Sequence, residues 1–83
     1  MSDAPRSILL FPSIHHVLAA ERVLQEARIW YDLVPAPREL SSNCGVAIEV
    51  RQADLPRVEE SAGRLGAFRV FRRAVEGYEE MPA

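Results

Sequence analysis

Short apolar runs alternate with two amphipathic patterns along the chain, and this order constrains the fold more than any other feature. Residues 7–11 form a short apolar run, and residues 29–34 form an aromatic and branched run that stops at Pro35. Both are short enough for strands. Residues 46–51 and 68–73 alternate between apolar and polar side chains, as half-buried strands do. The sequence therefore predicts four strands.

Two helices are expected between these strands. The first follows Ser13, a good N-cap, and the second follows Asp54 and stops at Gly66. Each has apolar residues at spacings of three and four, which form one stripe on a helix. The stripe of the first helix is Val17, Ala20, Leu24 and Ala27. The stripe of the second is Leu55, Val58, Ala62 and Leu65.

The resulting order is β-α-β-β-α-β. With right-handed crossovers it predicts an α+β fold of the ferredoxin-like type: a four-stranded antiparallel sheet with both helices on one face. A chain of 83 residues is long enough for one modest core, so residues 1–83 are expected to form a single domain. Its core is expected over about 7–74, and the polar segment 75–83 is expected to be a frayed tail.

Composition excludes several classes of function. The formal net charge is -2 and Arg and Glu alternate, so no cationic surface for nucleic acid is expected. All ten cations are Arg, which excludes Schiff-base chemistry on a lysine. No apolar run approaches the roughly 20 residues that cross a bilayer. The single cysteine cannot form an internal disulfide, and we expect a cytoplasmic protein whose thiol stays reduced.

That cysteine, Cys44, lies in the segment 35–45, which is rich in proline and in polar turn-forming residues. We expect a loop there, because such backbone groups are satisfied by turns and water. The first two strands should run the same way, so this loop should leave the sheet at the edge where the first helix begins. Cys44 is therefore expected close to Ser13.

This placement favours an exposed, anionic sulfur. A helix N-terminus can lower a thiol pKa from about 8.5 into the range of about 3.5 to 7.5. Arg38 would add a fixed cation, and Gly45 would permit positive φ and close approach of a second reactant. Further hydrogen-bond donors come from the loop residues Ser41, Ser42 and Asn43. We expect Cys44 to be a reactive thiol, although a lone cysteine is often a packed structural residue.

His15 and His16 fall in the first turn of the first helix, where the dipole favours neutral imidazole. A neutral imidazole could accept the proton of the Cys44 thiol, but only one of two adjacent helical residues can face a given point. Helix capping is the alternative role for the pair. Cys44 with one or both histidines is a thin set of metal ligands, so neither a metal nor another cofactor is expected. Arg38 and Glu39 could equally form a surface ion pair.

Two segments of the sequence resemble a known protein family. The segments "LLFPSIHHVLAAERVLQEARI" and "LVPAPRELSSNCGVAIEV" are similar to the small selenium/sulfur carrier-like domain family, over Leu9 to about Phe71. The most specific part is "PRELSS-CG", in which the carrier cysteine corresponds to Cys44, and "FPS-HH" also matches. Ile14 and Asn43 depart from the family pattern, in which a small hydroxyl residue and a third serine are common.

The resemblance implies a carrier protein rather than a turnover enzyme. Cys44 would receive sulfur or selenium from a donor protein, such as a cysteine desulfurase, as a persulfide or selenosulfide, and pass it to an acceptor protein. The sheet face without helices, with Glu49, Arg69 and Phe71, is the surface expected for a partner or for a second subunit.

Two other classes of function remain open on the sequence alone. One is a small binding or dimerisation module in which Cys44 has no chemical role. The other is a thiol redox sensor or thiol-dependent enzyme, although the chain has no second cysteine to resolve an oxidised one.

Overall fold

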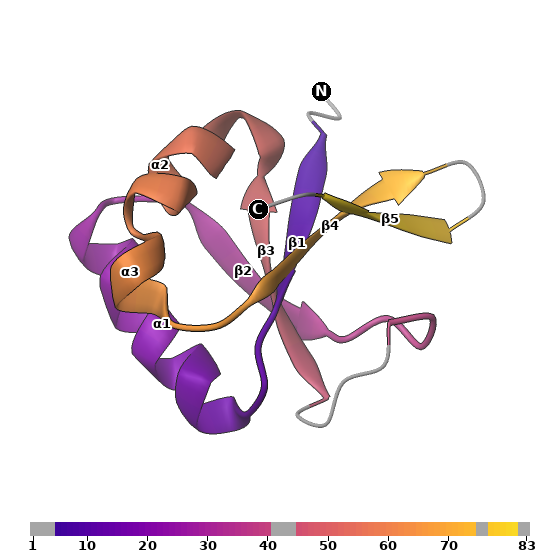
Figure 1. Ribbon diagram of the computed structural model, residues 1–83, viewed down its shortest axis with the longest axis horizontal. Coiled ribbons are helices and arrows are strands. Elements are labelled where there is room, and N and C mark those ends of the chain that lie inside the picture. The colour runs from indigo at the N-terminus through magenta and orange to yellow at the C-terminus, as the bar shows by residue number, and fades with distance from the viewer. Residues whose placement is uncertain (1–4, 41–44, 75–76, 82–83) are drawn as a thin grey trace.

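The computed structural model describes residues 5–40, 45–74 and 77–81 of the chain. Figure 1 shows a curved sheet with helices packed against one side of it. The elements in chain order are β1 (Arg6–Leu10), α1 (Ile14–Glu26), β2 (Tyr31–Pro35), β3 (Val46–Arg51), η1 (Gln52–Asp54), α2 (Leu55–Glu60), α3 (Ala62–Leu65), β4 (Arg69–Ala74) and β5 (Gly77–Met81).

The sheet is open and antiparallel throughout, with the strand order β2-β3-β1-β4-β5. β1 is the central strand, and Leu9 lies opposite Ile48 of β3 and Val70 of β4. These three side chains face the helices and join one core with α1, α2 and α3. The α+β class with an antiparallel sheet is therefore confirmed.

The expected number of strands is wrong, because β5 adds a fifth at the edge beside β4. It lies within the segment 75–83 that was expected to be a frayed tail. Arg72 faces Glu79 across the pair and forms an ion pair with it at 2.7 Å. Met81 packs against the main core. The segment was expected to be a tail because its sequence is polar. In the structure, however, Glu79 and Glu80 of β5 each form an ion pair with an arginine of β4.

The first helix starts as expected, with Ser13 as its N-cap and Val17, Ala20 and Leu24 buried. The second expected helix is divided into α2 and α3, and the short helix η1 precedes it. The break falls at Ser61, whose backbone angles of φ -94° and ψ 5° lie outside the helical range. The apolar stripe persists across this break, since its members Leu55, Val58 and Leu65 are buried.

The face of the sheet opposite the helices is covered by a second small cluster. Its buried members are Ile8, Leu10, Leu40, Ala47 and Phe71. Leu40 comes from the segment after β2, and Tyr78 of β5 packs against the same cluster. Phe71, named above as part of a surface for partners, is only 5% exposed. None of the described helices has the length and apolar character needed to cross a membrane.

Candidate functional site

The expected convergence of the helix start and the loop after β2 follows from the strand directions. β1 and β2 each pair antiparallel with β3, so they run the same way. Both therefore end at the same edge of the sheet. Figure 1 shows the end of β1, the start of α1, the end of β2 and the start of β3 at one end of the molecule. This edge carries the candidate site.

A hydrogen bond closes the loop between β2 and β3 at its base. The backbone N–H of Ala36 donates to the carbonyl oxygen of Gly45 at 3.1 Å. Within the loop the Leu40 N–H donates to the Pro37 carbonyl at 3.0 Å, which forms a turn. The Leu40 side chain is buried in the cluster on the helix-free face. The first half of the loop is thus anchored to the sheet.

Four of the expected site residues lie outside the described residues, so their expected roles remain predictions. These are Ser41, Ser42, Asn43 and Cys44. Gly45, directly after Cys44 in the chain, is described and exposed, with φ of +73°. Among the described residues beyond its own chain neighbours, no heavy atom lies within 4 Å of a Cβ placed on it. The chain therefore enters β3 through a left-handed residue, which favours glycine at this position.

Ser13 organises the start of α1. Its Oγ accepts a hydrogen bond from the His16 N–H at 3.4 Å and lies 2.7 Å from His16 Nδ1. Within the described part of the chain, the N–H groups of Ile14 and His15 have no hydrogen-bond acceptor. Such groups, with the helix dipole behind them, attract an anion.

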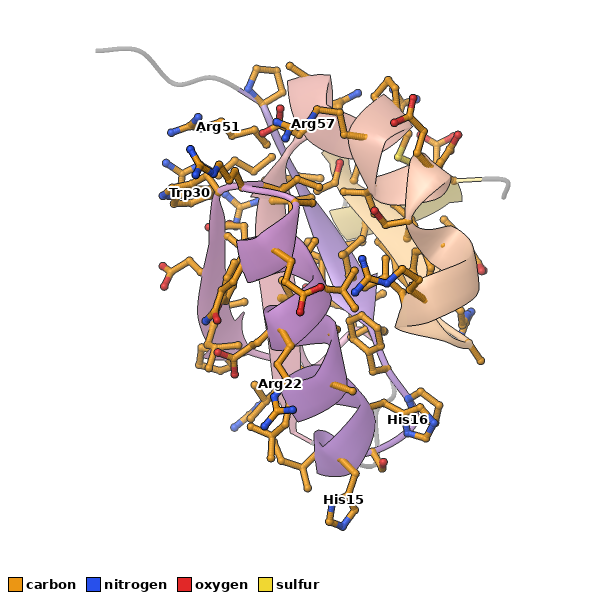
Figure 2. All side chains as sticks on the ribbon, turned by 90° about the vertical axis from the view of Figure 1, so that its left-hand side faces the viewer. His15, His16, Arg22, Trp30, Arg51 and Arg57 are labelled. Atoms are coloured by element: carbon orange, nitrogen blue, oxygen red, sulfur yellow. The ribbon has the colours of Figure 1, made fainter. Side chains whose placement is uncertain are left out.

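The two histidines do not share a direction. Figure 2 shows them on different sides of the first turn of α1, with His15 pointing away from the molecule. His16 is held by Ser13 and lies beside the connection from α3 to β4, where a Cβ on Gly66 would be 3.8 Å from its Cδ2. His16 therefore serves the helix cap, whereas His15 is exposed without a partner among the described residues.

Arg38 is exposed in the turn at the start of the loop. Among the described residues it has no ion pair or hydrogen bond, and Glu39 has none either. The two side chains thus do not form the surface pair that their sequence positions allowed. Nor does any group of three His, Cys, Asp or Glu side chains gather as a metal site within the described residues.

A feature that sequence reasoning missed lies at the other end of the sheet. Trp30 is partly buried and contacts two cations. The guanidinium carbons of Arg6 and Arg51 lie 4.7 and 5.0 Å from its ring centre. Arg6 and Arg51 face each other across β1 and β3. The stacking of both arginines on Trp30 depends on the pairing of β1 with β3, and no pattern of neighbouring residues in the sequence indicates it.

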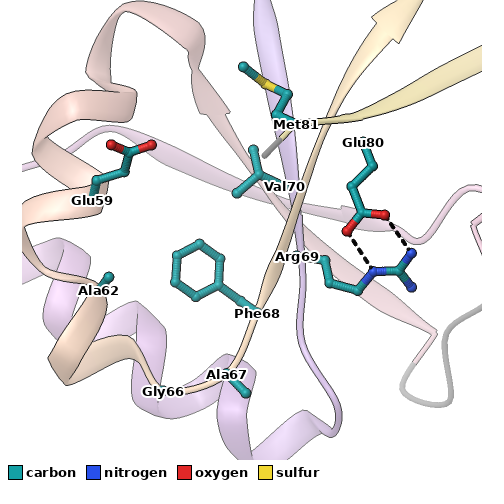
Figure 3. Close-up of a pocket in the computed structure, with 9 residues that line it drawn as sticks. All are labelled: Glu59, Ala62, Gly66, Ala67, Phe68, Arg69, Val70, Glu80 and Met81. Carbon is teal, nitrogen blue, oxygen red and sulfur yellow. Dashed lines mark hydrogen bonds and ion pairs between the residues drawn. The ribbon is translucent and has the colours of Figure 1, made fainter. Parts of the chain in front are cut away.

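A groove of about 720 Å³ lies between α3 and the strands β4 and β5 (Figure 3). Its apolar lining residues are Ala62, Ala67, Phe68, Val70 and Met81. At its rim stand Glu59 and the paired side chains of Arg69 and Glu80. The bidentate hydrogen bonds from Arg69 lower the pKa of the Glu80 carboxyl. The volume lies within the range of small-molecule sites.

Comparison with known proteins gives one match. The model of a family described as "Putative Se/S carrier protein-like" matches residues 6–66, which include the whole loop between β2 and β3. No curated protein and no solved structure matches the chain.

Proposed function

Because this chain belongs to the Se/S carrier protein-like family, we propose that it carries sulfur or selenium as a covalent adduct on Cys44. The observation that carries the proposal is the family match, whose span contains the only cysteine of the chain. The donor is a protein persulfide or selenosulfide, such as that of a cysteine desulfurase, and the acceptor is a second protein.

The chemistry is thiol exchange at the outer chalcogen. The Cys44 thiolate attacks the terminal sulfur of a donor persulfide, so a new S–S bond forms while the S–S bond of the donor breaks. The donor leaves as a thiolate, and no oxidant or reductant is consumed. For selenium, an S–Se bond forms on Cys44 as the S–Se bond of the donor breaks. Delivery repeats the step, with the acceptor thiolate attacking and Cys44 leaving.

The described surroundings of the loop support this role. The base of the loop stands at the sheet edge where α1 begins, and the N–H groups of Ile14 and His15 are available there for an anion. Arg38 adds an unpaired cation within the described residues. Gly45, directly after Cys44 in the chain, has no heavy atom of the described residues beyond its chain neighbours within 4 Å of a Cβ placed on it. These features favour an anionic sulfur that a second protein can reach.

The test is covalent loading followed by intact mass measurement. After incubation with a cysteine desulfurase and cysteine, or with a selenium donor, the protein should gain about 32 or about 79 mass units, the added atom of the exchange. Cys44→Ser should gain nothing. Arg38→Ala should load more slowly than Arg22→Ala, a matched loss of an exposed arginine without an ion pair among the described residues. An unmodified wild type, under conditions that load a known carrier, would exclude the carrier function.

The groove in Figure 3 favours a second candidate function, a small-molecule-binding module in which Cys44 takes no part. An apolar floor beside the Glu59 carboxylate suits a ligand with an apolar body and a cationic group. Ligand-observed NMR with amphiphilic amines should detect binding that Glu59→Gln weakens and Cys44→Ser leaves unchanged. Equal signals from the wild type and from Glu59→Gln would reject this candidate.

A further inference from the structure

The exposed large hydrophobic side chains of the described residues gather on one flank of the molecule. They are Ile14, Leu18 and Leu33, with exposures of 43%, 54% and 45%. The Tyr31 hydroxyl donates to Glu21 at 2.8 Å and accepts from Gln25 at 2.7 Å. These bonds fix the side of α1 that faces β2.

Periodicity then places the three apolar side chains on that flank. Leu18 lies three residues before Glu21, and Ile14 lies four before Leu18, so both share its side of the helix. Leu33 lies two residues after Tyr31, so it projects from the same face of β2. Together they form an exposed apolar strip along the edge strand, here named the β2 flank. Such a strip on a small protein indicates a contact surface.

The outer edge of β2 also carries backbone groups without a strand partner in the described sheet. The Ala36 N–H bonds to Gly45, so inward hydrogen bonds fall on alternate residues, Asp32 and Val34. Tyr31, Leu33 and Pro35 therefore point their backbone groups outward. The Gln52 N–H bonds to the Pro5 carbonyl at 3.0 Å, which fixes the same alternation from the other side of β3.

We propose that the β2 flank binds a second copy of this chain, through antiparallel pairing of the two β2 strands about a twofold axis at Leu33. The outward groups fit this arrangement. Leu33 and its copy exchange two N–H to carbonyl bonds, and each Tyr31 N–H donates to the Pro35 carbonyl of the other copy. Pro35 has no N–H, so it can only accept in this register, and the Tyr31 carbonyl opposite it gains no donor from the other strand. Asp32 faces Val34 of the other copy, so no like charges oppose each other.

The helices leave room for this pairing. α1 packs over β3 rather than over the edge strand. With strands about 4.8 Å apart, the two β3 strands of the dimer lie about 14 Å apart across the paired edges. Packed helices need about 8–10 Å between their axes. The space between the two α1 helices can therefore be filled by Leu18 and Leu33 of both copies.

The opposite edge of the sheet lacks these features. β5 carries Glu79 and Glu80, both paired with arginines of β4, and has no exposed large hydrophobic residue. Charged edge strands of this kind resist pairing. The helix-free face is covered by its own cluster, so the β2 flank is the better surface for a second copy than that face.

The dimer has a consequence for the loop that contains Cys44. In the register about Leu33, Trp30 of one copy lies opposite Ala36 of the other. The stack of Trp30 with Arg6 and Arg51 then stands beside the base of the neighbouring loop, where Arg51 adds a cation while Arg6 is paired with Glu49 at 3.0 Å. The dimer itself does not depend on the function proposed for Cys44.

Sedimentation equilibrium at several loading concentrations tests the dimer. The wild type should show a reversible monomer–dimer equilibrium, and Leu33→Lys should raise its dissociation constant at least about tenfold, because two ammonium groups would face each other. Ala53→Lys is the matched control. It adds the same charge at an exposed residue of η1, which packs beside β1 and α2. A monomeric wild type, or an unchanged equilibrium in Leu33→Lys, would overturn the proposal.

Disulfide trapping tests the register. In the double variant Cys44→Ser, Leu33→Cys, the paired Cα atoms would lie about 5.5 Å apart, within the range of about 4.4–6.8 Å that a disulfide spans. Mild oxidation should link two copies quickly. The control is the double variant Cys44→Ser, Asp32→Cys. Its two cysteines would not lie opposite each other, because residue 32 faces residue 34 of the other copy, so it should link slowly. Equal rates for the two variants would show that the strands do not pair about Leu33. Linkage of neither would exclude β2 pairing.

Discussion

Ala36 and Gly45 are joined by a backbone hydrogen bond of 3.1 Å that closes the loop between β2 and β3 at its base. Only eight residues lie between them, and Cys44 is the last of these. The left-handed conformation of Gly45 lets the chain return to the sheet at this point. The position of the loop therefore depends on backbone geometry as well as on side-chain packing.

The first prediction follows from this geometry. Gly45→Ala should lower the free energy of unfolding by about 1–2 kcal/mol, because a Cβ is disfavoured at positive φ. Gly63→Ala is the control, since at both positions the added Cβ has no heavy atom of the described residues, chain neighbours aside, within 4 Å. In a helix that substitution should stabilise by about 0.5–1 kcal/mol. Urea denaturation measures both, and opposite signs are expected.

Ser13 provides the second prediction. Ser13→Ala should lower the free energy of unfolding by about 1 kcal/mol, because it removes the oxygen that caps α1. Ser61→Ala is the matched control, as Ser61 begins α3 without a side-chain cap hydrogen bond. Its effect should stay within about 0.5 kcal/mol. If the two variants unfold at the same urea concentration, Ser13 does not act as a cap.

Leu40 provides a prediction about both the stability of the fold and the alkylation rate of Cys44. Leu40→Ala should cost about 2 kcal/mol of stability, because it leaves a cavity in the cluster on the helix-free face. The freed loop should also alkylate faster at Cys44 in native buffer. Leu55→Ala removes the same atoms from the main core, so it should also lower stability but leave the alkylation rate in native buffer unchanged. An alkylation rate that Leu40→Ala leaves unchanged would show that Leu40 does not restrain the second half of the loop.

Tyr31 makes stability depend on pH in the alkaline range. Burial, and then its hydrogen bond to Glu21, raise the pKa of the Tyr31 phenol above 10.0. The folded state thus holds this proton more tightly than the unfolded state. The stability that Tyr31 contributes should be complete below pH 10.0 and fall as pH rises through the folded pKa. Absorbance titration of the wild type and of Tyr31→Phe identifies this phenol, and Glu21→Gln should lower its pKa.

Ser7 is a buried residue of β1 whose hydroxyl has no hydrogen-bond partner among the described residues. Ser7→Ala should therefore raise the free energy of unfolding by about 1 kcal/mol, because alanine has no hydroxyl whose hydrogen bonds to water are lost on folding. Leu9→Ala, in the same strand, should destabilise by about 3 kcal/mol through its cavity. Thermal unfolding of both variants measures this contrast. A lower stability of Ser7→Ala would indicate an undescribed partner for the hydroxyl.

Local patterns in the sequence were sufficient for most elements and for the position of the loop. Ser13 as a cap, the stripe of α1 and the alternation of β3 each depend on residues a few positions apart, so they can be read along the chain. The order of these elements also brought the start of α1 and the loop to one edge. The motif around Cys44 indicated the family by itself.

Only the tertiary structure decided the features that depend on strand register. β5 reads as a polar tail, because its glutamates gain their partners from β4, and a cross-strand pair has no signal within either strand. Trp30 meets Arg6 and Arg51 for the same reason. The exposure of Leu33 depends on which strand lies at the edge and on α1 packing over β3. The sequence by itself determined the local elements and the position of the loop that contains Cys44, whereas long-range pairing determined which side chains and which strand edges remain exposed.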